Sequence, residues 1–363
     1  MSNPKNIKLN NLIKGIIRDS GVAPIYNCTL SINDPNNNFY YKKSVGVRDE
    51  SGATIHHNDA FRIGSITKTF TAVIIFQLIE EGFLQLDDKF LDRVTEPTKE
   101  LLKDLIVFEG VNYSNAITIK NLLQHRSGLR DYFADDERFL ATLRAFPNQE
   151  WNWRKVMEKY KEYELPQKAL SKPNEGYYYS DTNYLLLAVL AEELTHESFH
   201  NLLEKRILLP LNLQNTYLEY HQKSKNNTPV TYPYHSIHHL KNINTSFDWG
   251  AGGLIANADD LAIFIRALVE GQLFQKVETL QKILTFEESS PPKVPAKRET
   301  IYGMGLIKKK IAGHELIGHT SAYGAMMFYE PLYDRSIVIS LNQALGVHKA
   351  EWLLNKVLEE LEV

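Results

Sequence analysis

The stretch Phe61–Gly82, FRIGSITKTFTAVIIFQLIEEG, decides the fold of this chain. From Thr69 to Ile79 it contains no charged residue, and apolar side chains cover most of the circumference of the helix that it predicts. A helix that is apolar nearly all round lies in a protein core. Gly82, after two glutamates, is expected to end the helix as a left-handed C-cap. We therefore expect the chain to fold around this buried helix.

Ser65 and Lys68 stand at the mouth of the predicted helix, three residues apart. This spacing places both side chains on one helix face, one turn apart. A hydroxyl beside an amine is the arrangement that an activated serine needs. The S-x-x-K pattern alone is weak, because it also occurs at Ser2–Lys5 and Ser290–Lys293, but neither copy has this helical context. The alternative interpretation is an N-cap serine beside a surface lysine.

The composition is that of an ordinary globular protein of about two domains. Of its 363 residues, 43% are hydrophobic and 23% are charged, and the net charge of −3 gives no reason to expect nucleic acid as a partner. Cys28 is the single cysteine, which excludes an internal disulfide. No segment is apolar enough for a signal peptide or a membrane span. We expect a cytoplasmic location for the sequence as it stands, or a periplasmic or secreted one if a leader was removed.

Hydrophobic periodicity predicts strands at both ends of the chain and mostly helices between them. A helix is expected at about residues 7–18, followed by a hairpin of two strands at 25–32 and 39–47. Strands return in YGMGLIKKKI, HELIGH, AYGAMMFYE and SIVISLN, and a helix at 347–361 closes the chain.

This order predicts an α+β fold, with a mainly antiparallel sheet flanked by N- and C-terminal helices and an inserted all-helical domain. The sheet domain is expected to be discontinuous, at 1–84 and 246–363, with the helical domain at 85–245. The Ser65 helix would lie at the junction, where ligand clefts tend to form.

Two further motifs surround the serine and lysine in the chain. Tyr179 and Asp181, in YYYSDTNYLLL, precede a strongly apolar helix. A tyrosine near a Ser–Lys pair can pass protons between the serine oxygen and a leaving group, provided that the lysine charge lowers its pKa. Tyr113 also begins a Y-x-N pattern, but it sits in a polar loop.

The second motif is the predicted strand IGHTSAYG, which carries His319, Thr320, Ser321 and Ala322. Its backbone can lie beside an extended substrate. The N–H groups of Ala322 and Ser65 would then form an oxyanion hole, in which one donor is typically worth about 3–4 kcal/mol in the transition state. The alternative is that His319 and Thr320 are ordinary strand residues.

These motifs, in this order, resemble the serine β-lactamase/penicillin-binding-protein superfamily, in its class C β-lactamase and D-alanyl-D-alanine carboxypeptidase-like branch. The likeness covers most of the chain and includes the further blocks EEGFLQLDDK, ITIKNLLQHRSGL, WGAGGLIANADDLAIF and YGMGL. The resemblance implies that Ser65 is the acylated nucleophile, Lys68 its proton acceptor and Tyr179 the general base or acid. It also implies that the turn Trp249–Leu254 serves packing.

The resemblance places Asp181 where the family has an asparagine, and His319 where it has the lysine that meets a substrate carboxylate. An ionised Asp181 only accepts hydrogen bonds, and it would hold Lys68 protonated and shift the duty of the base toward Tyr179. His319 is neutral for much of the time near pH 7. With Ser321 in place of a glycine, this favours esterase, amidase or D-amino-acid peptidase activity over tight capture of a penicillin carboxylate.

We therefore expect a serine hydrolase that acts through an acyl-enzyme on an amide or ester bond of a small molecule or short peptide, without a cofactor or metal. It would be of D-Ala carboxypeptidase, D-aminopeptidase or esterase type. One alternative is a non-catalytic, penicillin-binding-like sensory module. A remote alternative is a zinc hydrolase that uses His196 and His200 of the literal H-E-x-x-H motif. That motif requires both histidines on one continuous helix, but here the helix over TNYLLLAVLAEELT is expected to end before it.

Overall fold

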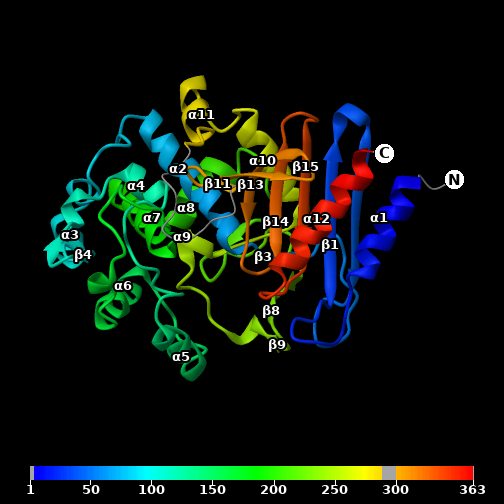
Figure 1. Ribbon diagram of the computed structural model, residues 1–363, viewed down its shortest axis with the longest axis horizontal. Coiled ribbons are helices and arrows are strands. Elements are labelled where there is room, and N and C mark those ends of the chain that lie inside the picture. Colours follow the sequence, from blue (N-terminus) through cyan, green and yellow to red (C-terminus); the bar gives the residue numbers. More distant parts are fainter. Residues whose placement is uncertain (1–3, 288–299, 363) are drawn as a thin grey trace.

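A seven-stranded antiparallel sheet joins the two ends of the chain (Figure 1). The computed structural model describes residues 4–287 and 300–362. Strand β1 pairs with β15, with Leu30 opposite Ile339, so the N-terminal hairpin lies beside the last strand. In spatial order the strands are β11 (Thr300–Tyr302), β12 (Ile307–Ile311), β13 (His314–Thr320), β14 (Ala325–Glu330), β15 (Arg335–Ser340), β1 (Asn27–Asp34) and β2 (Phe39–Gly46).

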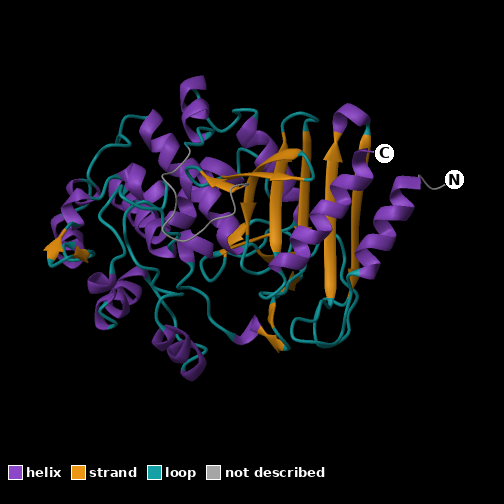
Figure 2. Ribbon diagram, viewed as in Figure 1, coloured by secondary structure: helices purple, strands orange, loops and turns teal. Residues whose placement is uncertain are grey.

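The two faces of this sheet bury different helices. Helices α1 (Pro4–Gly15) and α12 (Val347–Glu362) pack on each other and cover the face that carries Phe328. Because side chains alternate along a strand, Met327 faces the opposite side, toward α10 (Ala258–Val269) and the larger core. Figure 2 shows the sheet as one layer between these helices, with the other helices gathered beyond it.

The larger core is built around α2 (Thr67–Glu80), which is buried along almost its whole length. It contacts α7 (Asp181–Thr195), α9 (Trp249–Gly252) and α11 (Val277–Ile283). The remaining helices are α3 (Glu96–Leu102), α4 (Ile119–Leu123), α5 (Glu137–Ala145), α6 (Trp153–Glu162) and α8 (Phe199–Leu203). A small sheet consists of β6 (Tyr217–Leu218), β10 (Leu254–Ala256), β3 (Ala60–Arg62) and β7 (Val230–Thr231). Two separate short hairpins are formed by β4 (Val107–Phe108) with β5 (Val111–Asn112) and by β8 (Tyr234–His235) with β9 (His238–His239).

The predicted α+β fold, with its mainly antiparallel sheet and flanking helices, is confirmed. Gly82 has φ +84°, the left-handed conformation expected after α2. The division into domains at residues 84 and 245 stays a prediction, and the larger core contains residues from both sides of it. Within the described ranges, no helix has the length and apolar character that a membrane crossing requires.

Some predicted boundaries were wrong. The strand expected over YGMGLIKKKI is interrupted between Tyr302 and Ile307, so its residues belong to β11 and β12. The first helix begins three residues earlier than expected, at Pro4, and ends three residues earlier, at Gly15. The segment Ala322–Gly324 is a turn and not part of a strand, because the N–H of Ser321 donates to the carbonyl of Ala325 and closes it, so β14 begins only there. The other two S-x-x-K copies lie partly or wholly outside the described residues.

We predict that Leu353→Ala lowers the free energy of unfolding by about 2–5 kcal/mol, because the side chain is fully buried between α12 and the sheet and its loss leaves a cavity. Its neighbour Trp352 is 49% exposed, so Trp352→Ala should change stability far less. Urea denaturation of both variants measures the difference. Equal losses would contradict the packing described for this layer.

Candidate active site

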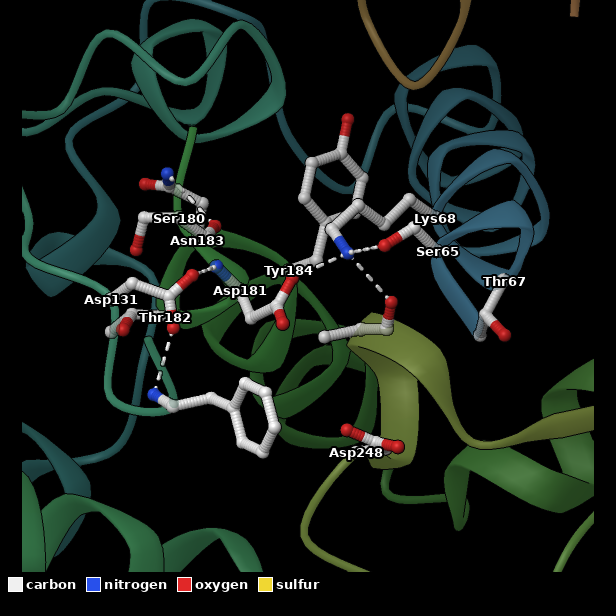
Figure 3. A network of polar contacts seen from close by, with 12 residues as sticks. Ser65, Thr67, Lys68, Asp131, Ser180, Asp181, Thr182, Asn183, Tyr184 and Asp248 are labelled. Atoms are coloured by element: carbon white, nitrogen blue, oxygen red, sulfur yellow. Dashed lines mark hydrogen bonds and ion pairs between the residues drawn. The ribbon is translucent and has the colours of Figure 1, made fainter. Parts of the chain in front are cut away.

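Lys68 is the charged centre of the site, and its side chain is 0% exposed. Its Nζ donates to Ser65 Oγ at 3.0 Å and to the carbonyl of Ala251 at 2.8 Å. It also lies 2.6 Å from Asp181 Oδ1. Figure 3 shows the Lys68 nitrogen between the three oxygens. The structure thus places Ser65, Lys68 and Asp181 together, as the sequence predicts.

Local packing explains why these groups meet. Ser65 lies in a 3₁₀ turn, Gly64–Ile66, that leads directly into α2. Asp181 begins α7, and α9 supplies the carbonyl of Ala251. A Cβ at Gly250 would come within 2.3 Å of Ala188 Cβ, so this glycine lets α9 pack closely on α7. The turn that contains it was expected only to fill the core, but it also supplies an acceptor to the lysine.

Asp181 decides the charge of the buried lysine. Burial alone lowers the pKa of Lys68, because a desolvated ammonium is unfavourable, but the charge of Asp181, aided by Tyr179 and by hydrogen bonds to both, outweighs burial, and the pKa is raised above its usual value. Lys68 is therefore an ammonium in the resting protein, as the sequence suggested. Since Lys68 already carries its proton, it cannot act alone as a base toward Ser65.

Tyr179 lies beside Ser65 and Lys68, with its ring centroid 5.0 Å from Lys68 Nζ. Burial raises the pKa of Tyr179, and the opposing charge of Lys68 and hydrogen bonds from Lys68 and Ser65 do not reverse this. The lysine charge does lower the tyrosine pKa, as the sequence-based condition required, but burial and the nearby Asp181 outweigh it, so the net shift is upward. Tyr179 is a neutral phenol at rest. Tyr113, the other match to the tyrosine motif, contacts Lys172 instead.

Two buried carboxyl groups that sequence reasoning missed also border Asp181. Asp131 Oδ2 accepts from the backbone N–H of Asp181 at 2.8 Å, and Oδ1 accepts from that of Phe133 at 2.7 Å (Figure 3). Asp248 accepts from the hydroxyl of Tyr323 at 3.2 Å. Burial, and then the charge of Asp181, raise the pKa of both Asp131 and Asp248 to about 7. Their only sequence signal is that they adjoin the HRSGL and WGAGG blocks.

His319 lies on β13 and is almost fully buried. Its Nδ1 donates to the carbonyl of Thr320 at 2.7 Å, and its Nε2 lies 3.3 Å from the hydroxyl of Tyr302. Burial and the charge of Lys68 lower the pKa of His319 to about 3, so the imidazole is neutral. Contact between this residue and a substrate carboxylate stays a prediction, but a positive charge on it is not available near pH 7.

The end of β13 lies against the serine turn. Gly64 has φ +48°, and a Cβ there would come within 2.5 Å of Ser321 Oγ, so only glycine permits this approach. None of the described residues accepts a hydrogen bond from the backbone N–H of Ser65 or Ala322. Thr320 alternates with His319 and lines a groove beside α12, so only its backbone faces the serine side.

The histidines of the H-E-x-x-H motif do not share a helix. Helix α7 ends at Thr195, and His196 has the left-handed φ of +55°. His200 belongs to the next helix, α8. Over residues 4–287 and 300–362, no three His, Cys, Asp or Glu side chains are grouped so that they could hold a metal ion.

Comparisons with known proteins extend over most of the chain. A family profile described as Beta-lactamase matches residues 35–358. Penicillin-binding protein 4* of Bacillus subtilis is 32% identical over 163 residues, which cover 44% of this chain and 30% of that protein. Teichoic acid D-alanine hydrolase of Staphylococcus aureus is 27% identical over 281 residues, which cover 75% of this chain and 59% of that protein. The matched regions thus span less than two thirds of these curated relatives.

A solved structure of a D-stereospecific amidohydrolase from Streptomyces sp. has the same fold. It matches with a TM-score of 0.73 at 24% identity, over 96% of this chain and 98% of that chain.

The expected cytoplasmic location stays a prediction, because none of these comparisons tests it.

Asp248 gives this site a pH-dependent stability. The folded protein holds the Asp248 proton up to a pKa of about 7, against an ordinary value of 3.8. Between these values ionisation favours the unfolded chain, so stability falls by about 1.4 kcal/mol per pH unit as pH rises. We predict that Asp248→Asn reduces the loss of unfolding free energy between pH 5 and pH 8 by about 1–3 kcal/mol.

Chemical denaturation at the two pH values measures this effect. Asp92→Asn is the matched control, because that side chain is 63% exposed. A loss in Asp248→Asn as large as in the unchanged protein would show that Asp248 ionises normally in the folded state.

Proposed function

Because this chain belongs to the beta-lactamase family of hydrolases, we propose that it is a serine hydrolase that cleaves an amide or ester bond through an acyl-enzyme at Ser65. One observation carries the proposal: Ser65 Oγ accepts a hydrogen bond from a fully buried ammonium, Lys68, whose charge is held by Asp181. A buried ion of this kind is costly unless it is paired, and it concentrates positive charge where a serine alkoxide would form. The family profile over residues 35–358 confirms the family resemblance noted in the sequence.

In acylation, Ser65 Oγ attacks the carbonyl carbon and its proton passes to Lys68. Lys68 at the same time passes one of its own protons to Asp181 across the 2.6 Å contact, so it remains an ammonium throughout. The carbonyl oxygen takes up the electron pair of the opened C=O bond. The free N–H groups of Ser65 and Ala322 stabilise that charge.

When the tetrahedral intermediate collapses, the bond from carbon to the leaving nitrogen or oxygen breaks. Tyr179 donates its phenolic proton to the leaving atom and takes a replacement from Lys68, which recovers one from Asp181. Each group thus returns to its resting state, and only the acyl group stays on Ser65. Water then attacks the acyl carbon from the place of the leaving group and gives a proton to Tyr179, which passes one to Lys68 while Lys68 passes one to Asp181. On collapse the bond from carbon to Ser65 Oγ breaks, Ser65 regains a proton from Lys68 and Lys68 one from Asp181, and the acid is released. The raised pKa of Tyr179 suits a proton donor that stays neutral, rather than a phenolate base.

The charges around Ser65 favour a substrate without a carboxylate next to the scissile bond. Lys68 is paired with Asp181, Arg62 is paired with Glu219, and His319 is neutral. A carboxylate would thus meet no unpaired cation among these groups, while Asp131 and Asp248 add buried carboxyl groups nearby.

The name of the amidohydrolase states D-stereospecificity, and the name of the teichoic acid D-alanine hydrolase states D-alanine. We include amides or esters of D-amino acids in the proposal as the substrate class, ahead of penicillins and D-alanyl-D-alanine peptides.

We predict that a fluorophosphonate probe labels the protein and that mass spectrometry locates the label on Ser65. Ser65→Ala should abolish labelling and lower hydrolysis by about 10³-fold or more. Ser51→Ala, on an exposed turn, is the control and should be labelled normally. A panel of D- and L-alanine amides and nitrophenyl esters, a chromogenic cephalosporin and D-alanyl-D-alanine peptides then tests the substrate class.

The outcomes separate the alternatives. A folded protein that no probe labels would favour the non-catalytic binding module. Activity that survives Ser65→Ala but is lost with a chelator would favour the zinc hydrolase. Faster turnover of the cephalosporin than of every amide and ester would contradict the substrate class and leave the serine mechanism in place.

The substitution Asp181→Asn tests the proton path. Without the carboxylate, the lowering of the Lys68 pKa by burial loses its largest opposing effect, so we expect more of the lysine to be neutral at pH 7–9. We predict that the acidic limb of the pH profile for Ser65 labelling changes, and that the rate then rises with pH as the lysine loses its proton. Asp92→Asn is the control. An acidic limb that is the same in both variants would refute the role given to Asp181.

A further inference from the structure

His125 lies directly behind the proposed catalytic tyrosine and has no role in the chemistry above. It follows α4, has a left-handed φ of +54°, and its side chain is 0% exposed. Sequence analysis quoted it only as part of the HRSGL block. Its imidazole packs on the Tyr179 ring, with the two ring centroids 4.2 Å apart.

The hydrogen bonds around His125 fix its tautomer. Ser127 Oγ donates to Asn183 Oδ1 at 2.6 Å, which orients the amide so that its Nδ2 faces the imidazole. That Nδ2 donates to His125 Nδ1 at 2.9 Å, and the backbone N–H of Ser180 donates to the same nitrogen at 3.2 Å. Because Nδ1 accepts twice, the ring proton lies on Nε2 and the imidazole is neutral.

The neutral state is consistent with the surroundings of the ring. Burial, and then the charge of Lys68, lower the pKa of His125 well below its usual value. His125 Nε2 is buried and has no hydrogen-bond partner among the described residues. The faces and edges of the imidazole instead contact aromatic rings, including Tyr302 with centroids 4.6 Å apart at 65°.

These contacts hold both neighbours of Ser180. The ring packs on Tyr179, and the bond to Nδ1 anchors the peptide that joins Tyr179 to Asp181. A displacement of about 1 Å at a reacting group can cost about 100-fold in rate. The His125 side chain thus helps to fix the position of the proton donor, Tyr179, and the position of Asp181, the counter-charge of Lys68.

We propose that His125 is a positioning residue that sets the place of Tyr179 and Asp181 in the acylation step, an inference that rests on the proposed function. It accepts from Ser180 and Asn183 as a neutral imidazole and transfers no proton. The reaction therefore needs its ring and its Nδ1 acceptor, and each can be removed separately.

Two substitutions make this separation. His125→Asn keeps an acceptor near the place of Nδ1 but removes the ring, and His125→Phe keeps a ring but removes the acceptor. We expect both to slow Ser65 labelling by a fluorophosphonate by about 10–100-fold. With a nitrophenyl ester, kcat should fall while KM stays within about threefold.

Leu353→Ala is the matched control, because it destabilises a layer of the protein away from the site. If His125 only supported stability, its variants would behave like this control, with a lower melting temperature and unchanged labelling of the folded protein. Labelling within twofold of the unchanged protein in both folded variants would overturn the proposal. An unchanged protein that is not labelled at all would overturn the proposed function and this inference with it.

A second measurement needs no active variant. In protein labelled with ¹⁵N-histidine, the His125 signals are assigned as those missing from His125→Asn, or from His125→Phe if the first does not fold. We expect a neutral ring with its proton on Nε2 that does not titrate between pH 5 and pH 8. A proton on Nδ1, or titration near pH 6.5, would overturn the proposal even if Ser65 is labelled.

Discussion

The contact between the buried ammonium of Lys68 and the carboxylate of Asp181 is the constraint on which the rest of the site depends. An ion that is removed from water costs several kcal/mol unless a counter-charge and hydrogen-bond acceptors replace the water. Helix α7 supplies the counter-charge, α9 supplies the carbonyl of Ala251, and the turn before α2 supplies Ser65 Oγ. Three segments far apart in the sequence must therefore pack together before the lysine can be buried, and the same packing brings Ser65, the proposed nucleophile, to it.

The paired charge also sets the state of the groups around it. Burial and then the positive charge of Lys68 keep the imidazoles of His125 and His319 neutral, while burial and then the negative charge of Asp181 keep the protons on Asp131 and Asp248 to about pH 7. A site with paired cations and neutral imidazoles is suited to hold a proton path in place. It is poorly suited to capture a carboxylate, which is why the proposal favours amide and ester substrates.

Sequence reasoning reached the fold and the centre of the site because both have local signals. The apolar run after Lys68, the alternation in the strands and the spacing of Ser65 are visible in short windows, and the exchange of an amide for Asp181 pointed to a protonated lysine. It missed Asp131, Asp248 and His125, whose contacts join distant segments. It anticipated that the Lys68 charge lowers the pKa of Tyr179 but not the net upward shift, because the larger effect is burial, which is a property of the folded chain.

The most direct test of this account is the charge of Lys68 itself. Protein labelled with ¹⁵N-lysine can be titrated by NMR, with the Lys68 Nζ signal assigned by its absence in Lys68→Met. The account predicts that this nitrogen remains an ammonium up to pH 10, because the pKa of Lys68 is raised above the ordinary lysine value of 10.5. Loss of its proton near pH 8 would show that Asp181 does not hold the charge, and would contradict the central claim.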